Sequence, residues 1–241
     1  MIVLFTDFGP TGPYMGQMKT VLYSQAPHTP VIDLFCDAPS CKPKASAYLL
    51  AAYVHEFPPG SVFLCVVDPG VGGERLPLML KADGRWFVGP GNGLFNMIAR
   101  HAKQVDCWKI IWRPEQMSAS FHGRDLFAPV AARLAREDKV PGERTIFDQE
   151  DKESWPDDLF ELIYIDYFGN MMTGICASNL SAEDELKLGK ISVKHARTFS
   201  DVQKGEVFWY ENSNGLVEVA INQGNAARQF GLSVGMEVRL A

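Results

Sequence analysis

The sequence has no apolar run long enough to cross a membrane. Its longest apolar stretches, residues 48–54 and 62–67, fall far short of the about 20 residues that a spanning helix needs. It also has no cluster of lysine and arginine, and its net charge is −6. Because nucleic-acid phosphates are neutralised by a concentrated basic face, these features argue against a nucleic-acid or membrane partner and favour a small-molecule ligand.

The sequence also lacks a charged leader and any paired pattern of cysteines. Its five cysteines are odd in number and scattered, so we expect free thiols in a reducing, cytoplasmic location. Cys36 and Cys41 lie close in the sequence, but no second Cys/His pair accompanies them, so a zinc site is not favoured.

What is present is an ordinary globular composition, with 241 residues of which 46% are hydrophobic and 22% charged. In the first part of the chain, short apolar runs alternate with amphipathic segments. Strands are predicted at residues 2–5, 30–34, 62–67, 76–81 and 86–88, and helices at 16–26, 43–57, 92–102 and 127–137. This alternation predicts an α/β domain with a largely parallel sheet over residues 1–147.

The composition changes abruptly at residues 148–158, which are rich in Asp and Glu around Trp155 and Pro156. We interpret this segment as an acidic linker. Beyond it, residues 159–241 contain short strand-like runs broken by Gly and Asn. These runs are residues 159–166, 170–177, 191–195, 207–211, 216–221 and 236–240. The sequence therefore predicts a smaller, mostly β second domain.

Three glycine-rich loops follow predicted strands of the first domain, at residues 6–9, 68–75 and 89–93. In an open parallel sheet, ligands bind outside the carboxyl ends of the strands, so these loops are the first candidates for a site. In the first loop, Asp7 is placed to accept hydrogen bonds from a ribose diol. A turn or helix-capping aspartate explains it equally well.

The second loop brings one acid, Asp68, and one permanently charged base, Arg75, within a short tether. The two side chains are able to converge on one point; the alternative is an ion pair on a flexible surface loop. The segment lacks the Gly-Lys-Ser/Thr ending of a P-loop and the glycine spacing of a dinucleotide site, so phosphate binding is not supported.

Among the five histidines, His122 has the most suggestive setting, in a polar turn before an apolar helix. An imidazole there can face a pocket and act in acid–base chemistry. The sequence has no pair of histidines at metal spacing on one helix and no Gly-x-Ser-x-Gly motif, which argues against metal-dependent hydrolysis and a serine nucleophile.

In the second domain, two segments are dense in turn residues and side-chain amides, around residues 166–170 and 211–227. Hairpin turns explain either one adequately. Their content also suits a purine, with Phe168 as a stacking surface and Asn225 as an edge contact.

Taken in order along the chain, these motifs resemble those of the S-adenosylmethionine hydroxide adenosyltransferases, relatives of fluorinase and chlorinase. The matching segments are residues 6–9, 67–72 with Arg75, 89–93, 121–125, 166–170 and 225–227. The resemblance implies hydrolysis of S-adenosyl-L-methionine to adenosine and L-methionine, with water or hydroxide attacking ribose C5′ and with no cofactor or metal. It also implies a homotrimer that binds its ligand between domains of neighbouring subunits.

The resemblance further assigns roles to residues. Asp68, Arg75 and His122 would activate the water, although the sequence does not decide whether Asp68 or His122 accepts the proton. The implied substrate-binding residues are Asp7 for the ribose, Phe168, Asn170, Asn225 and Ala227 for the adenosine, Asp166 and Ser213 for the methionine, and Glu218 nearby.

Two other functions compete with this hydrolase. A non-catalytic adenosine or S-adenosylmethionine binding protein would need Asp7, Phe168 and Asn170 but not the three catalytic candidates together. A halide-dependent adenosyl transferase is disfavoured, because halogenating relatives lack the acid and base that Asp68 and Arg75 match.

Overall fold

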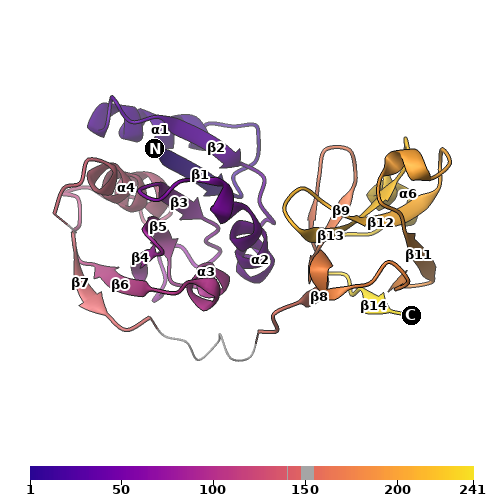
Figure 1. Cartoon of the computed structure of the whole chain (residues 1–241). Coiled ribbons are helices and arrows are strands. Elements are labelled where there is room, and N and C mark those ends of the chain that lie inside the picture. Colours follow the sequence, from indigo (N-terminus) through magenta and orange to yellow (C-terminus); the bar gives the residue numbers. More distant parts are fainter. Residues whose placement is uncertain (140, 148–154) are drawn as a thin grey trace. The chain divides into compact units, whose positions relative to one another are not determined.

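The computed structural model describes residues 1–139, 141–147 and 155–241. The chain divides into two compact units, coloured from indigo to magenta and from orange to yellow in Figure 1. Unit 1 comprises Met1–Leu50 and Val54–Ser154, and unit 2 comprises Ala51–Tyr53 and Trp155–Ala241. Of the predicted acidic linker, residues 148–154 lie outside the described part of the chain.

Unit 1 is built on a seven-stranded sheet in the order β2-β1-β3-β5-β4-β6-β7. Its strands are β1 (Ile2–Thr6), β2 (Val31–Phe35), β3 (Val62–Val66), β4 (Pro77–Ala82), β5 (Arg85–Pro90), β6 (Val105–Ile110) and β7 (Gly142–Thr145). The pairs β1–β2, β1–β3 and β3–β5 are parallel, whereas β4–β5, β4–β6 and β6–β7 are antiparallel. The α/β class is confirmed, but the sheet is mixed rather than largely parallel.

The turn between β4 and β5 explains this correction. Asp83 and Gly84 are the only residues between the two strands, and both have positive φ, at 45° and 81°. An Asp-Gly pair in this conformation forms a tight hairpin turn, which forces the flanking strands to be antiparallel. The sequence contains this signal, but the prediction overlooked it, together with the strands β6 and β7.

Helices cover both faces of this sheet, with α1 and α4 on one side and α2 and α3 on the other in Figure 1. Their bounds are α1 (Tyr14–Gln25), α2 (Pro43–Tyr53), α3 (Asn96–His101) and α4 (Ala128–Ala135), with a π-helical turn at Gly123–Phe127 and a 3-10 turn at Val54–Glu56. Met18 and Leu22 of α1 pack with Ile2 and Leu4 of β1 in one core. Each predicted helix is present. The last three are shorter than predicted, whereas α1 begins two residues earlier, at Tyr14.

Unit 2 is a second seven-stranded sheet, in the order β14-β10-β11-β12-β13-β9-β8. Its strands are β8 (Leu159–Ile165), β9 (Met171–Cys176), β10 (Leu186–Leu188), β11 (Ile191–His195), β12 (Val207–Glu211), β13 (Leu216–Ile221) and β14 (Arg239–Leu240). Short turns at Ala177–Asn179 and Phe199–Asp201 and one helix, α6 (Ala226–Phe230), complete it. Strands thus outnumber helices in unit 2. Strand β10 and helix α6 were not predicted, and the run at 236–240 contains only the short strand β14.

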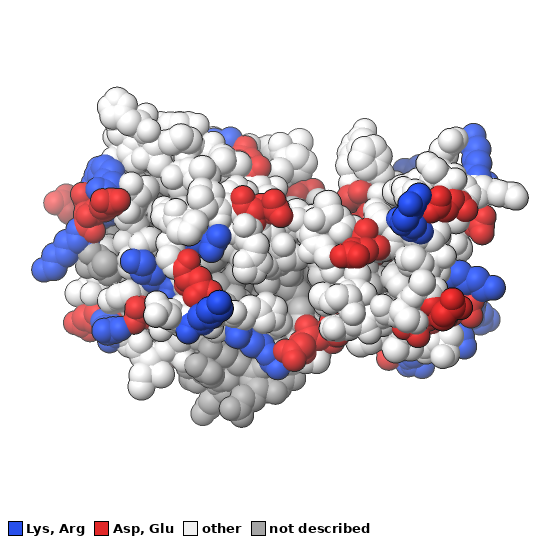
Figure 2. All heavy atoms as spheres, in the orientation of Figure 1, with Lys and Arg blue, Asp and Glu red and all other residues white. Residues whose placement is uncertain are grey.

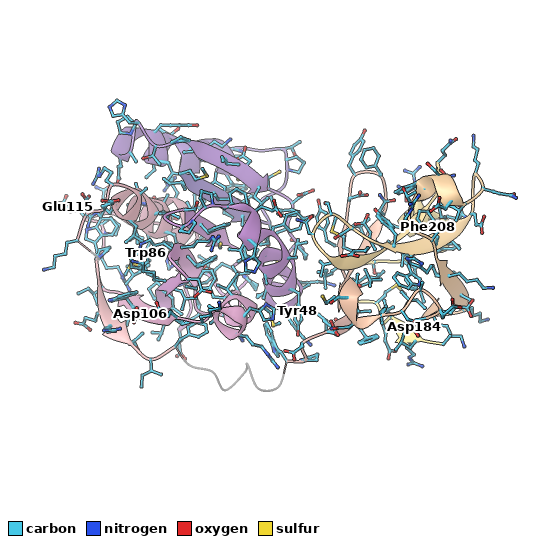
Figure 3. The ribbon with its side chains drawn as sticks, viewed as in Figure 1. Tyr48, Trp86, Asp106, Glu115, Asp184 and Phe208 are labelled. Carbon is cyan, nitrogen blue, oxygen red and sulfur yellow. The ribbon has the colours of Figure 1, made fainter. Side chains whose placement is uncertain are left out.

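The sheet of unit 2 buries different side chains on its two faces. Because side chains alternate along a strand, Val217, Val219 and Ile221 of β13 face the main core, together with Trp209 of β12. Phe208, labelled in Figure 3, lies on the opposite face in a small apolar cluster with Ala196 and Ala220. Tyr210 and Glu218 lie directly opposite each other on β12 and β13, on this second face.

Charged side chains are interspersed over the face shown in Figure 2, where blue and red residues alternate without a large patch of one sign. Within the described part of the chain, no helix combines the length and apolar character needed to cross a membrane.

Candidate active site

Two loops of unit 1 meet at one edge of its sheet. β1 and β3 are adjacent and parallel, with Thr6 opposite Val66, so Asp7 and Asp68 follow neighbouring strand ends. Together with His122 they line a cavity of about 310 Å³. Asp7 and Asp68 thus lie at the carboxyl ends of two parallel strands, where the sequence predicts a ligand to bind.

Arg75 holds Asp68 and His122 together beside this cavity. Its Nε lies 2.9 and 3.0 Å from the two carboxylate oxygens of Asp68, and its Nη2 also donates to Asp68 Oδ2. The same Nη2 lies 2.9 Å from His122 Nδ1. The side chains of Arg75 and Asp68 are only 10% and 4% exposed. The surface ion pair that we considered as an alternative is thus wrong, since this pair is buried.

The Arg75 contact fixes the protonation of His122. A guanidinium only donates hydrogen bonds, so His122 Nδ1 must accept, and the neutral ring carries its proton on Nε2. Burial lowers the pKa of His122 below its ordinary value, and the positive charge of Arg75 lowers it further. At neutral pH the ring is therefore uncharged and offers an N–H donor at Nε2.

Backbone contacts fix the loop that carries Asp68. Gly72 has φ of +81°, and a Cβ there would lie 2.8 Å from the carbonyl oxygen of Ala119, so only glycine fits without a shift. Asn92, in the third glycine-rich loop, donates from Nδ2 to the Val67 carbonyl at 2.9 Å. The third loop thus supports the residue before Asp68.

His122 precedes the π-helical turn Gly123–Phe127, which leads into α4. Asp125 in that turn accepts a hydrogen bond from the Ser118 backbone N–H at 2.8 Å and pairs with the guanidinium of Arg124. Arg124 in turn donates to Gln17 of α1 at 2.7 Å. These contacts hold the loop that contains His122; π-helical turns of this kind often occur at functional sites.

Asp7 lines the same cavity, and its Oδ2 accepts a hydrogen bond from the backbone N–H of Cys41 at 2.9 Å. Burial raises the pKa of Asp7, although the Cys41 hydrogen bond opposes this change. Cys41 has φ of +56°, an uncommon conformation for a residue with a side chain. No sequence pattern predicts Cys41 as a partner of Asp7.

An aromatic cluster borders the cavity and was not predicted. The rings of Phe8, Tyr14 and Phe121 contact one another with centroids 5.4–5.8 Å apart, and all three residues line the cavity. Tyr14 is 49% exposed. Such a surface suits the flat, partly apolar body of a nucleoside or a similar ligand.

In unit 2, Asp166 closes the turn between β8 and β9. Its Oδ1 accepts from the Asn170 backbone N–H at 2.8 Å, and its Oδ2 accepts from the Asn170 side chain at 3.0 Å. Phe168, at the tip of this turn, is 69% exposed, and the neighbouring Tyr167 is 95% exposed. The turn therefore presents aromatic rings outward on a rigid base.

The adenine-edge candidates Asn225 and Ala227 already have partners within unit 2. Asn225 Oδ1 accepts from the Arg228 backbone N–H at 2.7 Å and caps α6. The Ala227 N–H donates to the Gly169 carbonyl, and its own carbonyl accepts from Leu232. The Asn225 amide also packs where a Cβ of Gly169 would lie. The Asn225 Nδ2 group and the Ala227 methyl are not used in these contacts and can contact a ligand.

The remaining predicted residues of unit 2 differ in burial. Ser213 is exposed, and its hydroxyl donates to Asn214 Oδ1 at 3.1 Å. Glu218 is 3% exposed, and it accepts from the Tyr210 hydroxyl at 2.6 Å and from Asn212 Nδ2 at 2.9 Å. One cavity is lined by all the unit 2 candidates except Ala227, namely Asp166, Phe168, Asn170, Ser213, Glu218 and Asn225. The sequence did not single out Tyr210.

Among the residues that the structure describes, no three His, Cys, Asp or Glu side chains gather into a possible metal site. The five cysteines are free thiols.

Two family models match most of the chain. Residues 2–142 match the SAM hydroxide adenosyltransferase N-terminal domain, and residues 160–239 match the C-terminal domain of the same family. The two matched segments correspond in order to the two sheets.

Known proteins are similar over nearly their full lengths. A protein of Thermus thermophilus named (R)-S-adenosyl-L-methionine hydrolase is 35% identical over 99% of this chain and 98% of its own length. A fluorinase of Actinopolyspora mzabensis is 23% identical over 100% of this chain and 96% of its own. The crystal structure of an uncharacterized conserved protein from Thermotoga maritima superposes with a TM-score of 0.90 at 28% identity, covering 100% of both chains.

Proposed function

The chain belongs to the SAM hydroxide adenosyltransferase family, and from this membership we propose that it hydrolyses S-adenosyl-L-methionine to adenosine and L-methionine. The observation that carries the proposal is the buried arrangement of Asp68, Arg75 and His122 beside a cavity. A protein that only bound the ligand would not need these three groups together.

The leaving group of this reaction departs with little assistance from the protein. A water oxygen forms a bond to ribose C5′ while the C5′–S bond breaks, and the bonding electrons pass to sulfur to give a neutral thioether. Because a neutral thioether leaves without a proton, the step requires neither a general acid nor a Lewis acid. We therefore propose a reaction without metal or cofactor, in which only the water needs activation.

We propose that the Asp68 carboxylate accepts the proton of this water. The Nδ1 lone pair of His122 accepts from Arg75, and the ring carries its proton on Nε2. His122 can therefore orient the water by donating a hydrogen bond to it, but it cannot accept the proton of the water. The Asp68 carboxylate has lone pairs beyond those that accept from Arg75 and takes the proton as the new C–O bond forms. Assistance of this kind contributes about 10²–10⁴ in rate, and in-line alignment contributes a further ~7–11 kcal/mol.

The substrate-binding roles follow the family resemblance and the two cavities. We propose that Asp7 accepts hydrogen bonds from the ribose diol through lone pairs not used by Cys41. Phe168 and Asn170 contact the adenosine, and Asp166 with Ser213 holds the amino-acid end. Asn225 contributes its Nδ2 group to the adenine edge, whereas Ala227 contributes through its methyl group.

The two sets of residues lie in different units, which bears on the assembly. We propose a homotrimer in which the unit 1 cavity of one subunit works with the unit 2 cavity of a neighbour, in the cytoplasm. The hydrolases among the relatives are named for the (R) form of the substrate, and we propose the same configuration at sulfur here.

The test is to incubate the purified protein with separated (R) and (S) forms of S-adenosyl-L-methionine in chloride-free buffer with a chelator. Adenosine and methionine are then followed by chromatography. Equal amounts of both products, preferentially from the (R) form, support the proposal. Product formation only after chloride or fluoride is added would indicate a halide-dependent transferase, and adenosine binding without turnover would indicate a binding protein.

A further inference from the structure

Glu218 is a carboxylate almost completely buried in the sheet of unit 2, where ionisable groups are rarely found without a role. It is 3% exposed. Its position follows from strand alternation, because its neighbours Val217 and Val219 face the main core and Glu218 points to the other side. There it lies opposite Tyr210 on β12 and Met172 on β9.

Three polar side chains surround this carboxylate. The Tyr210 hydroxyl donates to Oε1 at 2.6 Å, and Asn212 Nδ2 donates to Oε2 at 2.9 Å. The Asn170 side chain also lies near this carboxylate, in the lining of the same cavity, and lowers its pKa. Asn170 and Asn212 are themselves buried, each 8% exposed. The carboxylate is thus the centre of a buried polar network.

The network joins two turns that are far apart in the sequence. Asn170 closes the β8–β9 turn through both oxygens of Asp166. Asn212 closes the β12–β13 turn, because its Oδ1 accepts from the backbone N–H groups of Asn214 and Leu216 at 2.9 and 3.0 Å. The first turn carries Phe168 and the second carries Ser213.

The energetics argue against a role in folding alone. Burial raises the pKa of Glu218, and the nearby Asp166 raises it further, whereas the bonds from Tyr210 and Asn212 oppose the change. Burying a charge is costly, and apolar side chains of similar volume are often as good or better for stability at such positions. What an apolar residue cannot do is orient two asparagines that hold separate turns.

We propose that Glu218 is a positioning residue that orders the turns of Asp166 and Asn212 relative to each other before ligand binds. Its carboxylate acts through Asn170 and Asn212, which keep Phe168 and Ser213 in place for the adenosyl ligand. The identity of the ligand in this role rests on the proposed function. The ordering of the two turns is independent of it.

The experiment compares three variants of the full chain. Glu218→Leu removes both acceptors, whereas Glu218→Gln keeps an acceptor for Asn212 and a donor for the Tyr210 oxygen. Thr173→Val is the matched control, since Thr173 is fully buried in the adjacent strand β9 and donates to the Val217 carbonyl at 2.9 Å. It removes a buried hydrogen bond from the same sheet without contacting either turn's asparagine.

Two measurements are made on each variant, namely amide hydrogen exchange over residues 166–170 and 212–216 and the dissociation constant for adenosine. We expect Glu218→Leu to speed exchange at both turns and to weaken adenosine binding at least about tenfold, the usual effect of losing one good hydrogen bond to a charged group. Its KM for substrate should rise more than its kcat falls. Glu218→Gln should recover most of the loss, and Thr173→Val should lower only the melting temperature.

The outcomes separate this inference from the proposed function. If Glu218→Leu changes exchange at the two turns no more than Thr173→Val does, the positioning role is wrong, whatever the protein catalyses. If the wild type neither binds adenosine nor hydrolyses the substrate, the proposed function fails, while faster exchange in Glu218→Leu still supports the ordering of the turns.

Discussion

At the level of single residues, the proposed reaction depends on one guanidinium with two partners. Arg75 donates to both oxygens of Asp68 and to Nδ1 of His122, so the acid and the imidazole form one unit rather than two independent groups. The sequence indicated these three residues through their family resemblance, but it left open which of the two accepts the proton. The hydrogen-bond geometry of the ring supplies the argument for Asp68, and spacing along a chain does not contain that information.

Replacing Asp68 by Asn tests the acceptor role. The amide has nearly the same shape, but it lacks the charge and the basic lone pairs, so we expect kcat to fall by about 10²–10⁴ while adenosine still binds. The control is Asp106→Asn, at a half-buried residue labelled in Figure 3 that pairs with Arg144; it should leave kcat unchanged. Wild-type kcat in Asp68→Asn would refute the assignment.

The pH dependence of kcat tests the state of His122. Since its pKa lies below the ordinary value of 6.5, the ring stays neutral through the neutral range and is protonated only in more acidic solution. Protonation would place a hydrogen on Nδ1 and break the bond from Arg75. We therefore expect kcat to be flat near neutrality and to fall at lower pH, with a midpoint under 6.5.

His122→Asn is the companion variant for this profile, because its side-chain oxygen replaces Nδ1 as an acceptor without titrating. The part of the acidic fall that His122 causes should be lost in that variant, so any remaining fall should have a lower midpoint than in the wild type, at a lower plateau. A wild-type midpoint at or above 6.5, or an unchanged acidic fall in His122→Asn, would show that another group controls the rate.

At the scale of elements, the site was predictable where a local rule determines geometry. Strands β1 and β3 read clearly as apolar runs, and their parallel pairing brings the following loops together. The Asp83-Gly84 pair is an equally local signal, and it predicts the antiparallel hairpin that makes this sheet mixed. The hydrogen bond between Cys41 and Asp7 could not be predicted from the sequence, because the two residues are 34 positions apart and no pattern links them.

The loop that carries Asp68 and Arg75 gives a prediction at this scale. Gly72→Ala would place a Cβ 2.8 Å from the Ala119 carbonyl, and the loop must shift to relieve the contact. A displacement of about 1 Å at a reacting group can cost about 10²-fold in rate. We expect a loss of kcat of about that size.

Gly205→Ala is the matched control for this loop, since Gly205 has φ of +82° and no atom within 4 Å of the added Cβ. It shares the backbone strain, worth about 1–2 kcal/mol, without the clash. Activity should therefore survive in Gly205→Ala at temperatures below unfolding. Equal kcat in both variants would show that the position of this loop does not limit the reaction.

At the scale of the whole molecule, the division into an α/β part and a β-rich part was predictable from the change in hydrophobic period. The hydrogen-bond partners of individual polar groups in unit 2 could not be predicted in this way. Asn225 and Ala227 both make hydrogen bonds within the unit, and Glu218 is buried behind two turns. Which partner a side-chain amide or carboxylate finds depends on tertiary neighbours that a single sequence does not specify.

The proposed trimer predicts complementation between inactive subunits. Asp68→Asn damages the unit 1 cavity, and Phe168→Ala damages unit 2, so each pure variant should have low activity. If neighbouring subunits share a site, mixing the two with subunit exchange creates some sites with both wild-type parts, and activity should return. Light scattering should give the mass of three 26.8 kDa chains. No recovery in mixed trimers would contradict a shared site.

The most direct test of the account is to run the reaction in water labelled with oxygen-18 and to analyse the adenosine by mass spectrometry. If water attacks C5′, the heavy oxygen must appear in the adenosine 5′-hydroxyl, and the methionine must remain unlabelled. Adenosine without the label, or a 5′-halogenated nucleoside in its place, would contradict attack by water at that carbon.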